Sequence, residues 1–379
     1  MKRLFPWMMI LAAMSSVMPV WNRAQACTSA IVGGRLTSSG GPLLWKHRDS
    51  GHKNNFVARV EPTDSTLAYV ALFNAGDKYL EEAWVGFNEA GFAVMNTASY
   101  NLAPDTAAVK DREGVVMSRA LATCRTVNDF LRVLDMEMTA SGGAGVQANF
   151  GVTDATGEGM YVEMSDHSYK CYRLSETDGD DVMIRSNYSY SGVADGRLGE
   201  VRHDDALHLF EAARNNGSVS AETFTEGFSR SFYHAREGKD MLADTDYHLL
   251  TDRGEYIPRR SSCASVVIEG CRPGGDPAVE TVMWVAIGYP ALSVPYPVTL
   301  DSIPHQLQRD PQSGRSPYCD KINLLRDKAY PRKGKEGKWL IDADYLRHHI
   351  PAVTEEARRN YRDFIEAHPE RPVFPEHIQ

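Results

Sequence analysis

Apolar residues fall in short runs separated by turn residues along most of the chain, and in two stretches they recur every three to four positions. The short runs end at Gly, Pro, Asn, Asp or Ser, which is typical of strands. The helical spacing predicts helices over 118–138 and 202–213. The predicted strands cover 28–32, 43–47, 66–73, both arms of 84–96, 148–152, 160–164, 264–268 and 281–287. Because strands and helices alternate in blocks, we predict a layered α+β fold.

The N-terminal segment has the pattern of a secretory signal peptide. Two basic residues precede an apolar run over 4–20, and small residues, Ala24 and Ala26, follow it. We therefore expect a signal peptide over 1–26 that is cleaved after Ala26. The mature protein would be exported, to the periplasm or to the outside of the cell.

Cleavage after Ala26 would make Cys27 the first residue of the mature chain, with a free α-amine beside its thiol. An α-amine has an ordinary pKa of about 7.7–8.0, so it can take the thiol proton near neutral pH and return it to a leaving nitrogen. This arrangement favours amide hydrolysis with Cys27 as the nucleophile. Two other interpretations stay open at this point. Cys27 could be half of a disulfide or the lipid-modified residue of a lipoprotein, although Ala24 stands where a lipoprotein has Leu.

Length, charge and hydropathy limit the class of protein. The chain has 379 residues, of which 42% are hydrophobic, and its net charge of −9 argues against nucleic-acid binding. Once the leader is removed, no apolar run approaches the ~20 residues that a membrane-spanning helix needs. We expect a catalytic domain over 27–319 and a charged, helical C-terminal extension over 320–379 packed on it.

The cysteines and histidines form no recognised framework. The five cysteines beyond Cys27 match no stapled scaffold or zinc spacing, so we expect mostly free, buried thiols. His203 and the pair His348 and His349 are interpreted as surface residues, and the chain has neither a nucleotide-binding Gly loop nor a His-Glu-x-x-His sequence. We therefore predict no cofactor and no metal site. The oligomeric state is not determined by these patterns.

The first predicted hairpin brings polar residues toward Cys27. Gly-rich turns join the strands over 28–32 and 43–47, so the far end of the second strand returns beside the start of the first. Asp49 could then orient the α-amine or a substrate; a surface ion pair is the local alternative. Asn96 ends an apolar strand, where its amide could donate to an oxyanion or could instead cap its own turn.

Three segments together resemble a known family. They are Cys27-Thr28 after a removable segment, a Gly-rich hairpin that runs into Lys46-His47-Arg48-Asp49, and the Gly-Phe-Asn-Glu-Ala-Gly-Phe-Ala-Val-Met-Asn sequence over 86–96. These are similar to N-terminal-nucleophile hydrolases, in particular the group of acyl-coenzyme A:6-aminopenicillanic acid acyltransferase, with choloylglycine hydrolases and penicillin V acylases as cousins. The resemblance covers roughly 27–297. It implies a four-layer αββα sandwich with the cysteine at the start of a central strand.

The resemblance also implies five catalytic residues: the nucleophile, the carboxylate that holds its amine, an oxyanion-hole amide, a second active-site Asn and an arginine near the nucleophile. In that order they are Cys27, Asp49, Asn96, Asn187 and Arg260, with Arg259 as the alternative for the arginine. One position departs from the cousin bile-acid hydrolases, which carry Arg where this chain has Lys46. Lys lacks the forked geometry with which Arg binds an anion, so bile-acid specificity is not expected.

The expected activity is hydrolysis of a linear amide bond in a small N-acyl substrate through a thioester on Cys27. The thioester can pass to water or to an acceptor amine, so amidase and acyltransferase share every residue up to that intermediate. Export favours water, because acyl-coenzyme A is scarce outside the cell. A dipeptidase with the same nucleophile and a non-catalytic exported binding protein stay open as alternatives. No nucleic-acid or membrane partner is expected for the mature chain.

Overall fold

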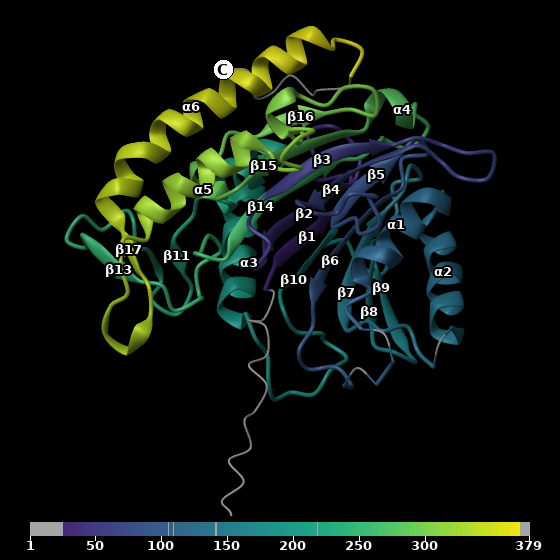
Figure 1. Ribbon diagram of the computed structural model, residues 1–379, viewed down its shortest axis with the longest axis horizontal. Helices are drawn as coiled ribbons and strands as arrows, with labels where there is room; N and C mark the ends of the chain where they lie inside the picture. Colours follow the sequence, from purple (N-terminus) through teal and green to yellow (C-terminus); the bar gives the residue numbers. More distant parts are fainter. Residues whose placement is uncertain (1–25, 105, 109, 141, 218, 372–379) are drawn as a thin grey trace, which may run out of the picture.

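The computed structural model describes residues 26–104, 106–108, 110–140, 142–217 and 219–371. The signal peptide expected over 1–26 lies outside the described residues, except for Ala26. Two antiparallel sheets pack face to face, with helices on both outer faces (Figure 1). The predicted α+β class and the αββα order of layers are confirmed.

The first sheet has six strands and carries the start of the described chain. In spatial order they are β10 (Val182–Arg185), β1 (Thr28–Val32), β2 (Leu43–Asp49), β14 (Ser262–Glu269), β15 (Val282–Ile287) and β16 (Tyr296–Val298). Strands β1 and β2 form the predicted hairpin, and Thr28 pairs with His47. This register places the last residues of β2 beside Cys27, as the sequence predicts.

The second sheet has seven strands, each paired with the next along the chain. They are β3 (Asn55–Val60), β4 (Tyr69–Asn74), β5 (Val85–Asn88), β6 (Ala93–Ala98), β7 (Ala148–Thr153), β8 (Gly159–Met164) and β9 (Tyr169–Arg173). All the predicted strands are present in the two sheets, with β4 beginning three residues after the predicted start at 66. Strands β3, β9, β10 and β16 lie where no strand is predicted.

Alternation along the strands builds the core on both faces of the first sheet. Ile31 and Leu44 point between the sheets, whereas Ala30 and Trp45 point to the outer helical layer. Because neighbouring residues of a strand face opposite sides, a strand with both faces covered shows a continuous apolar run rather than an alternating one. The same rule sends Lys46 between the sheets, where its side chain is buried.

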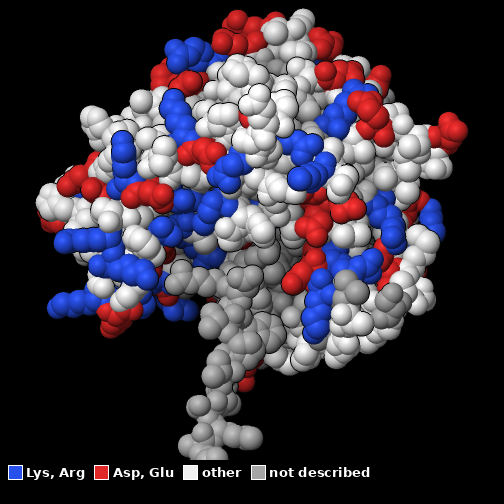
Figure 2. All heavy atoms as spheres, in the orientation of Figure 1, with Lys and Arg blue, Asp and Glu red and all other residues white. Residues whose placement is uncertain are grey.

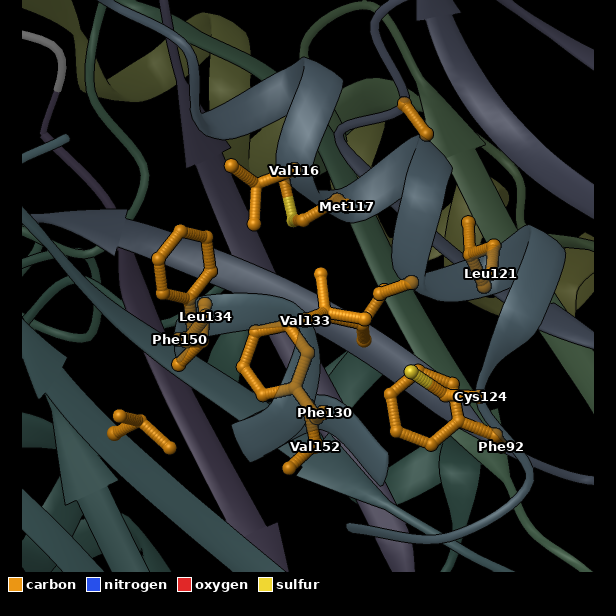
Figure 3. Packing of buried hydrophobic residues seen from close by; sticks show 14 of the residues in the cluster. Phe92, Val116, Met117, Leu121, Cys124, Phe130, Val133, Leu134, Phe150 and Val152 are labelled. Atoms are coloured by element: carbon orange, nitrogen blue, oxygen red, sulfur yellow. The ribbon is translucent and has the colours of Figure 1, made fainter. Parts of the chain in front are cut away.

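Helices α1 (Glu113–Thr123) and α2 (Val127–Thr139) cover the outer face of the seven-stranded sheet. Figure 3 shows Phe130 of α2 among side chains from both helices and from β7, including Phe150, with which its ring makes an edge contact of 5.5 Å between centroids. The single helix predicted over 118–138 is therefore wrong. The chain breaks after Thr123 because Thr126 and Asp129 form a capping box that starts a new helix.

The other outer layer is formed by α3 (Glu200–Asn215), the π-helix η2 (Thr223–Phe228) and α6 (Ala343–Ala367). Helix α3 confirms the helix predicted over 202–213. Helix α5 (Pro317–Ala329) spans the boundary expected at 320, and Cys319 on it packs into the core between the sheets. Figure 1 shows α6 running along the outside of this layer, and its Tyr361 contacts Trp284 of β15 at 4.9 Å between ring centroids.

The remaining elements are short. They are α4 (Pro277–Glu280), the 3-10 turns η1 (Leu174–Glu176), η3 (Pro290–Leu292), η4 (His305–Leu307) and η5 (Lys335–Gly337), and two ribbons, β11 (Tyr233–His234) with β12 (Lys239–Asp240) and β13 (Leu249–Thr251) with β17 (Leu340–Asp342).

Across the described part of the chain, no helix combines the length and the apolar composition that crossing a membrane requires. All six cysteines are free thiols, and five of them are buried.

Candidate active site

Cys27 immediately precedes β1, and Arg202 of the outer helix α3 donates to its carbonyl. Its side chain is buried, with 4% of the residue exposed. Burial raises the pKa of the Cys27 thiol, while the positive charge of Lys46 and a hydrogen bond from the backbone N–H of Asp49 act in the opposite direction. The negative charge of the Asp49 carboxylate acts with burial, so the pKa of the thiol stays above its ordinary value although Lys46 favours the thiolate.

Asp49 ends β2 next to Cys27, and its carboxylate is held from two sides. The Ser262 hydroxyl donates to Oδ1 at 2.6 Å, and Arg259 Nε donates to Oδ2 at 2.9 Å. Arg259 also donates through Nη2 to the carbonyl of Ala26 at 3.2 Å, directly before Cys27. The carboxylate is thus fixed beside the peptide bond that joins Ala26 to Cys27.

The two adjacent arginines at the mouth of β14 point to different places. Arg259 lies beside Asp49, whereas the Arg260 guanidinium stacks on the Trp339 ring at 3.8 Å and lies 3.6 Å from Asp327. The structure therefore brings Arg259, the alternative in the sequence analysis, into the group around Cys27. Arg260 reaches the C-terminal elements instead.

Lys46 and Asn96 face each other between the two sheets. Lys46 Nζ donates to Asn96 Oδ1 at 2.7 Å and to the carbonyl of Trp84 at 2.6 Å. Burial lowers the pKa of Lys46 to about 7. Because its oxygen is occupied by Lys46, Asn96 turns its amide Nδ2 the other way, and that nitrogen donates to none of the described residues. Nδ2 is free to donate to a bound oxyanion.

Asn187 is fully buried and is connected to Cys27 through an arginine that the sequence analysis missed. Arg202 of α3 donates through Nη2 to Asn187 Oδ1 at 2.7 Å, and through Nη1 to the carbonyl of Cys27 at 2.7 Å and to Thr28 Oγ1 at 2.8 Å. Asn187 Nδ2 donates to the carbonyl of Ala98 at 2.9 Å. One guanidinium therefore fixes both the backbone of Cys27 and the side chain of Asn187.

A signal for Arg202 exists in the sequence. Arg202 shares the buried stripe of α3 with Ala206 and Phe210, at successive spacings of four residues. A charged residue on an apolar helical stripe is rarely buried unless its hydrogen bonds are satisfied, so its presence indicates a buried polar partner. Burial lowers the pKa of Arg202 to about 10, which leaves it cationic near neutral pH.

Ser262 and His47 form a second support that the sequence analysis missed. Ser262 gives its only hydroxyl proton to Asp49, so the contact of 2.9 Å between His47 Nε2 and Ser262 Oγ requires His47 to donate. Burial lowers the pKa of His47 to about 4, so the ring is neutral with its proton on Nε2. The chain of donors from His47 through Ser262 to Asp49 fixes the orientation of the carboxylate.

The arrangement suits nucleophilic chemistry at a carbonyl group. A thiol, a fixed carboxylate, a buried lysine and a free amide donor surround one backbone position. The described residues contain no group of three or more His, Cys, Asp or Glu arranged to hold a metal ion.

Comparisons with known proteins give weak likenesses only. Neither protein-family models nor curated proteins match the sequence. Among solved structures, the chain is similar to a Caenorhabditis elegans ortholog of N-acylethanolamine-hydrolyzing acid amidase, with 11% identity, a TM-score of 0.42 and coverage of 64% of this chain and 92% of the other. A mutant of the conjugated bile acid hydrolase from Clostridium perfringens has 12% identity, a TM-score of 0.42 and coverage of 73% and 95%.

A third similar structure is penicillin V acylase from Agrobacterium tumefaciens, with 14% identity, a TM-score of 0.36 and coverage of 73% of this chain and 87% of the other. Two of the three bear the names of enzymes that the N-terminal motifs resemble. Because the identities and TM-scores are low, the function proposed below rests on the geometry of the site.

Proposed function

We propose that this protein is an exported cysteine hydrolase of the N-terminal-nucleophile type, which cleaves a linear amide bond in a small N-acyl substrate. The observation that carries the proposal is the position of Cys27. It lies at the very start of a central strand, with Asp49 beside its N-terminal side and the Lys46–Asn96 pair toward the space between the sheets. Export rests on the leader pattern that precedes Cys27.

The proposed reaction begins once the bond between Ala26 and Cys27 has been cut. The new α-amine, held by Asp49, takes the thiol proton, and the thiolate attacks the amide carbonyl carbon of the substrate. Asn96 Nδ2 donates to the oxyanion of the tetrahedral intermediate, and Lys46 adds positive charge nearby. The ammonium then protonates the leaving nitrogen, the C–N bond breaks, and an acyl thioester on Cys27 remains.

The second half of the reaction returns the free enzyme. Water attacks the thioester carbonyl, the α-amine takes a proton from that water, and the acid leaves as the thiolate is released and protonated. An amine in place of water would give acyl transfer through the same intermediate. Arg259 Nη2, which in the described chain binds the carbonyl of Ala26, becomes available to a substrate oxygen after cleavage.

Intact-mass analysis of the secreted protein tests this proposal. We expect a chain that starts at Cys27, a thiol alkylator that adds to it, and an acyl adduct trapped from a panel of N-acyl amides. Cys27→Ser should lose both the alkylation and the adduct, whereas the matched variant Cys171→Ser, which removes a half-buried thiol on β9, should lose neither. A mature start elsewhere, or a lipid on Cys27, would contradict the mechanism.

The same panel separates the alternatives for the substrate. Release of free acid without added amine indicates hydrolysis, and product formation only with an added amine indicates acyl transfer. Cleavage restricted to short peptides with a free amino terminus would favour the dipeptidase. Complete lack of adduct and turnover with an intact N-terminal Cys27 would favour the binding protein.

A further inference from the structure

A basic cavity lies on the ribbon formed by β13 and β17, and Gly254, which follows Arg253 of its wall, accepts a hydrogen bond from Arg259 at 3.4 Å. The cavity has a volume of about 750 Å³. Its walls carry five cationic side chains and a single acidic one. The lining residues are Thr251, Arg253, Arg332, Lys333, Gly334, Lys335, Glu336, Lys338 and Leu340. Figure 2 shows several blue Lys and Arg side chains on the flank where Figure 1 places β13 and β17.

The cavity is made by tertiary structure rather than by a run of basic residues alone. Antiparallel pairing of Thr251 with Leu340 brings Arg253 to the segment that precedes β17. The backbone N–H of Asp252 donates to the carbonyl of Trp339 at 2.9 Å and extends this pairing. Cations from two segments about 80 residues apart in the sequence therefore converge on one hollow.

Most of these cations lack an acidic partner. Lys338 forms an ion pair with Glu336 at 3.5 Å, which occupies the single carboxylate in the wall. No carboxylate of the described residues lies within salt-bridge distance of Arg253, Arg332 or Lys335, nor of Lys333, whose ammonium lies 5.7 Å from the Trp339 ring centroid. The cationic side chains of the wall are exposed, so salt screens their mutual repulsion and the fold gathers them at a small cost in stability.

A chain with a net charge of −9 has many carboxylates that could have neutralised this hollow. Local features that lower stability without a compensating contact within the protein are typical of ligand sites. The volume exceeds the needs of a single phosphate and lies in the usual range for small-molecule sites. Four cations that lack a carboxylate partner match a ligand that carries several negative oxygens close together.

We propose that this cavity binds a multivalent oxyanion, a ligand bearing two or more phosphoryl groups. The chemistry is shared by a free polyphosphorylated compound and by the head group of a phosphorylated lipid. Arginine forks and lysine ammonium groups both donate to phosphate oxygens, and their long side chains can close around a ligand of this size. This site does not depend on the proposed amidase activity.

Thermal unfolding of the full secreted chain tests the proposal with tripolyphosphate as the probe and sodium chloride at equal ionic strength as the reference. We expect tripolyphosphate to raise the Tm of the wild type by about 2–4 °C. The triple variant Arg253→Gln, Arg332→Gln, Lys335→Gln should differ from the wild type in two respects. Its Tm without the probe should be higher than that of the wild type, because repulsion is relieved, and the probe should no longer raise it.

A matched variant controls for the change in net charge. Lys78→Gln, Arg125→Gln and Lys321→Gln remove three exposed cations that lie outside the cavity wall. This variant should keep the full rise in Tm with tripolyphosphate. An equal loss of the rise in the control, or a rise retained in the cavity variant, would overturn the proposal.

A vesicle experiment then identifies the source of the ligand. Vesicles of phosphatidylcholine are compared with vesicles that also contain a phosphatidylinositol bisphosphate. Binding only to the latter, displaced by tripolyphosphate, would indicate a lipid head group. Binding to tripolyphosphate without binding to vesicles would indicate a free ligand. Absence of binding to both probes would refute the site.

Discussion

The hydroxyl of Ser262 lies 2.6 Å from Oδ1 of Asp49 and donates its only proton to that carboxylate. Oδ2 receives the second donor, Arg259 Nε. The Asp49 side chain is therefore fixed in rotation beside the backbone of Ala26 and Cys27. In the proposed mechanism this carboxylate holds the α-amine that serves as the base, so its orientation sets the position of the proton acceptor.

Removing the Ser262 hydroxyl should lower the rate without much effect on substrate binding. Hydrogen bonds to charged groups contribute about 1.5–3 kcal/mol, so we expect Ser262→Ala to reduce kcat about 10- to 100-fold with little change in KM. Ser262→Thr keeps the hydroxyl and should restore most of the rate. Ser265→Ala removes a buried hydroxyl of the same strand that bonds to Trp45 and Ser229 instead. A similar loss of kcat in that control would show that the effect is not specific to Asp49.

We expect Asn96 to stabilise the oxyanion by donating from its amide nitrogen, so a residue of the same shape without this donor should not replace it. Its oxygen is occupied by Lys46, so only Nδ2 can reach a substrate oxyanion. We expect Asn96→Ala and the isosteric Asn96→Asp each to lower kcat about 10²- to 10³-fold, measured on the N-acyl amide that gives the best adduct. An Asn96→Asp variant with wild-type kcat would exclude the proposed oxyanion contact, because a carboxylate cannot donate.

Buried Lys46 should make stability depend on pH. Its pKa in the folded chain is lowered to about 7, below the ordinary value, so between pH 7 and about 10.5 the unfolded chain binds more protons than the folded one. The free energy of unfolding should therefore rise with pH in this window, by at most about 1.4 kcal/mol per pH unit.

Urea unfolding of Cys27→Ala and of Cys27→Ala with Lys46→Met measures this dependence without the thiol titrating. We expect the free energy of unfolding of the methionine variant to exceed that of Cys27→Ala alone by the largest margin below pH 7, where the folded Lys46 chain carries a buried ammonium. Its advantage should shrink as the pH rises through the window. Two parallel curves over pH 6–10 would mean that Lys46 does not titrate there.

Gly199 is required where the chain passes Arg202. Its φ is +83°, and a Cβ added to it would lie 2.3 Å from Arg202 Nη2. We expect Gly199→Ala to displace the guanidinium from Asn187 and to lower both kcat and the free energy of unfolding. Left-handed backbone in a non-glycine residue alone costs about 1–3 kcal/mol.

A second glycine, away from Arg202, separates the cost of left-handed backbone from the effect of displacing the Arg202 guanidinium. Gly238 has a φ of +66°, and a Cβ there would meet no atom within 4 Å. Gly238→Ala should therefore show the backbone cost in urea unfolding but keep the wild-type kcat. Equal losses of kcat in the two variants would argue against a role for Arg202 in holding the site.

Much of the candidate site could be predicted from the sequence because its members lie at the ends of recognisable strands. The hairpin register brings Asp49 to Cys27 through local pairing alone, and Asn96 ends an apolar strand. The choice between Arg259 and Arg260 could not be made in this way. Adjacent residues leave the backbone in different directions, so a bend at the mouth of β14 sends one toward Asp49 and the other to Trp339.

Most of the strands and the layered class follow from the sequence, because alternation and turn residues act over a few neighbouring positions. The side chains that complete the group around Cys27 come from distant parts of the chain. Arg202 reaches Cys27 across 175 positions, and Ser262 reaches Asp49 across 213. Such contacts depend on how the layers pack, and a buried polar residue does not reveal in the sequence which distant group satisfies its hydrogen bonds.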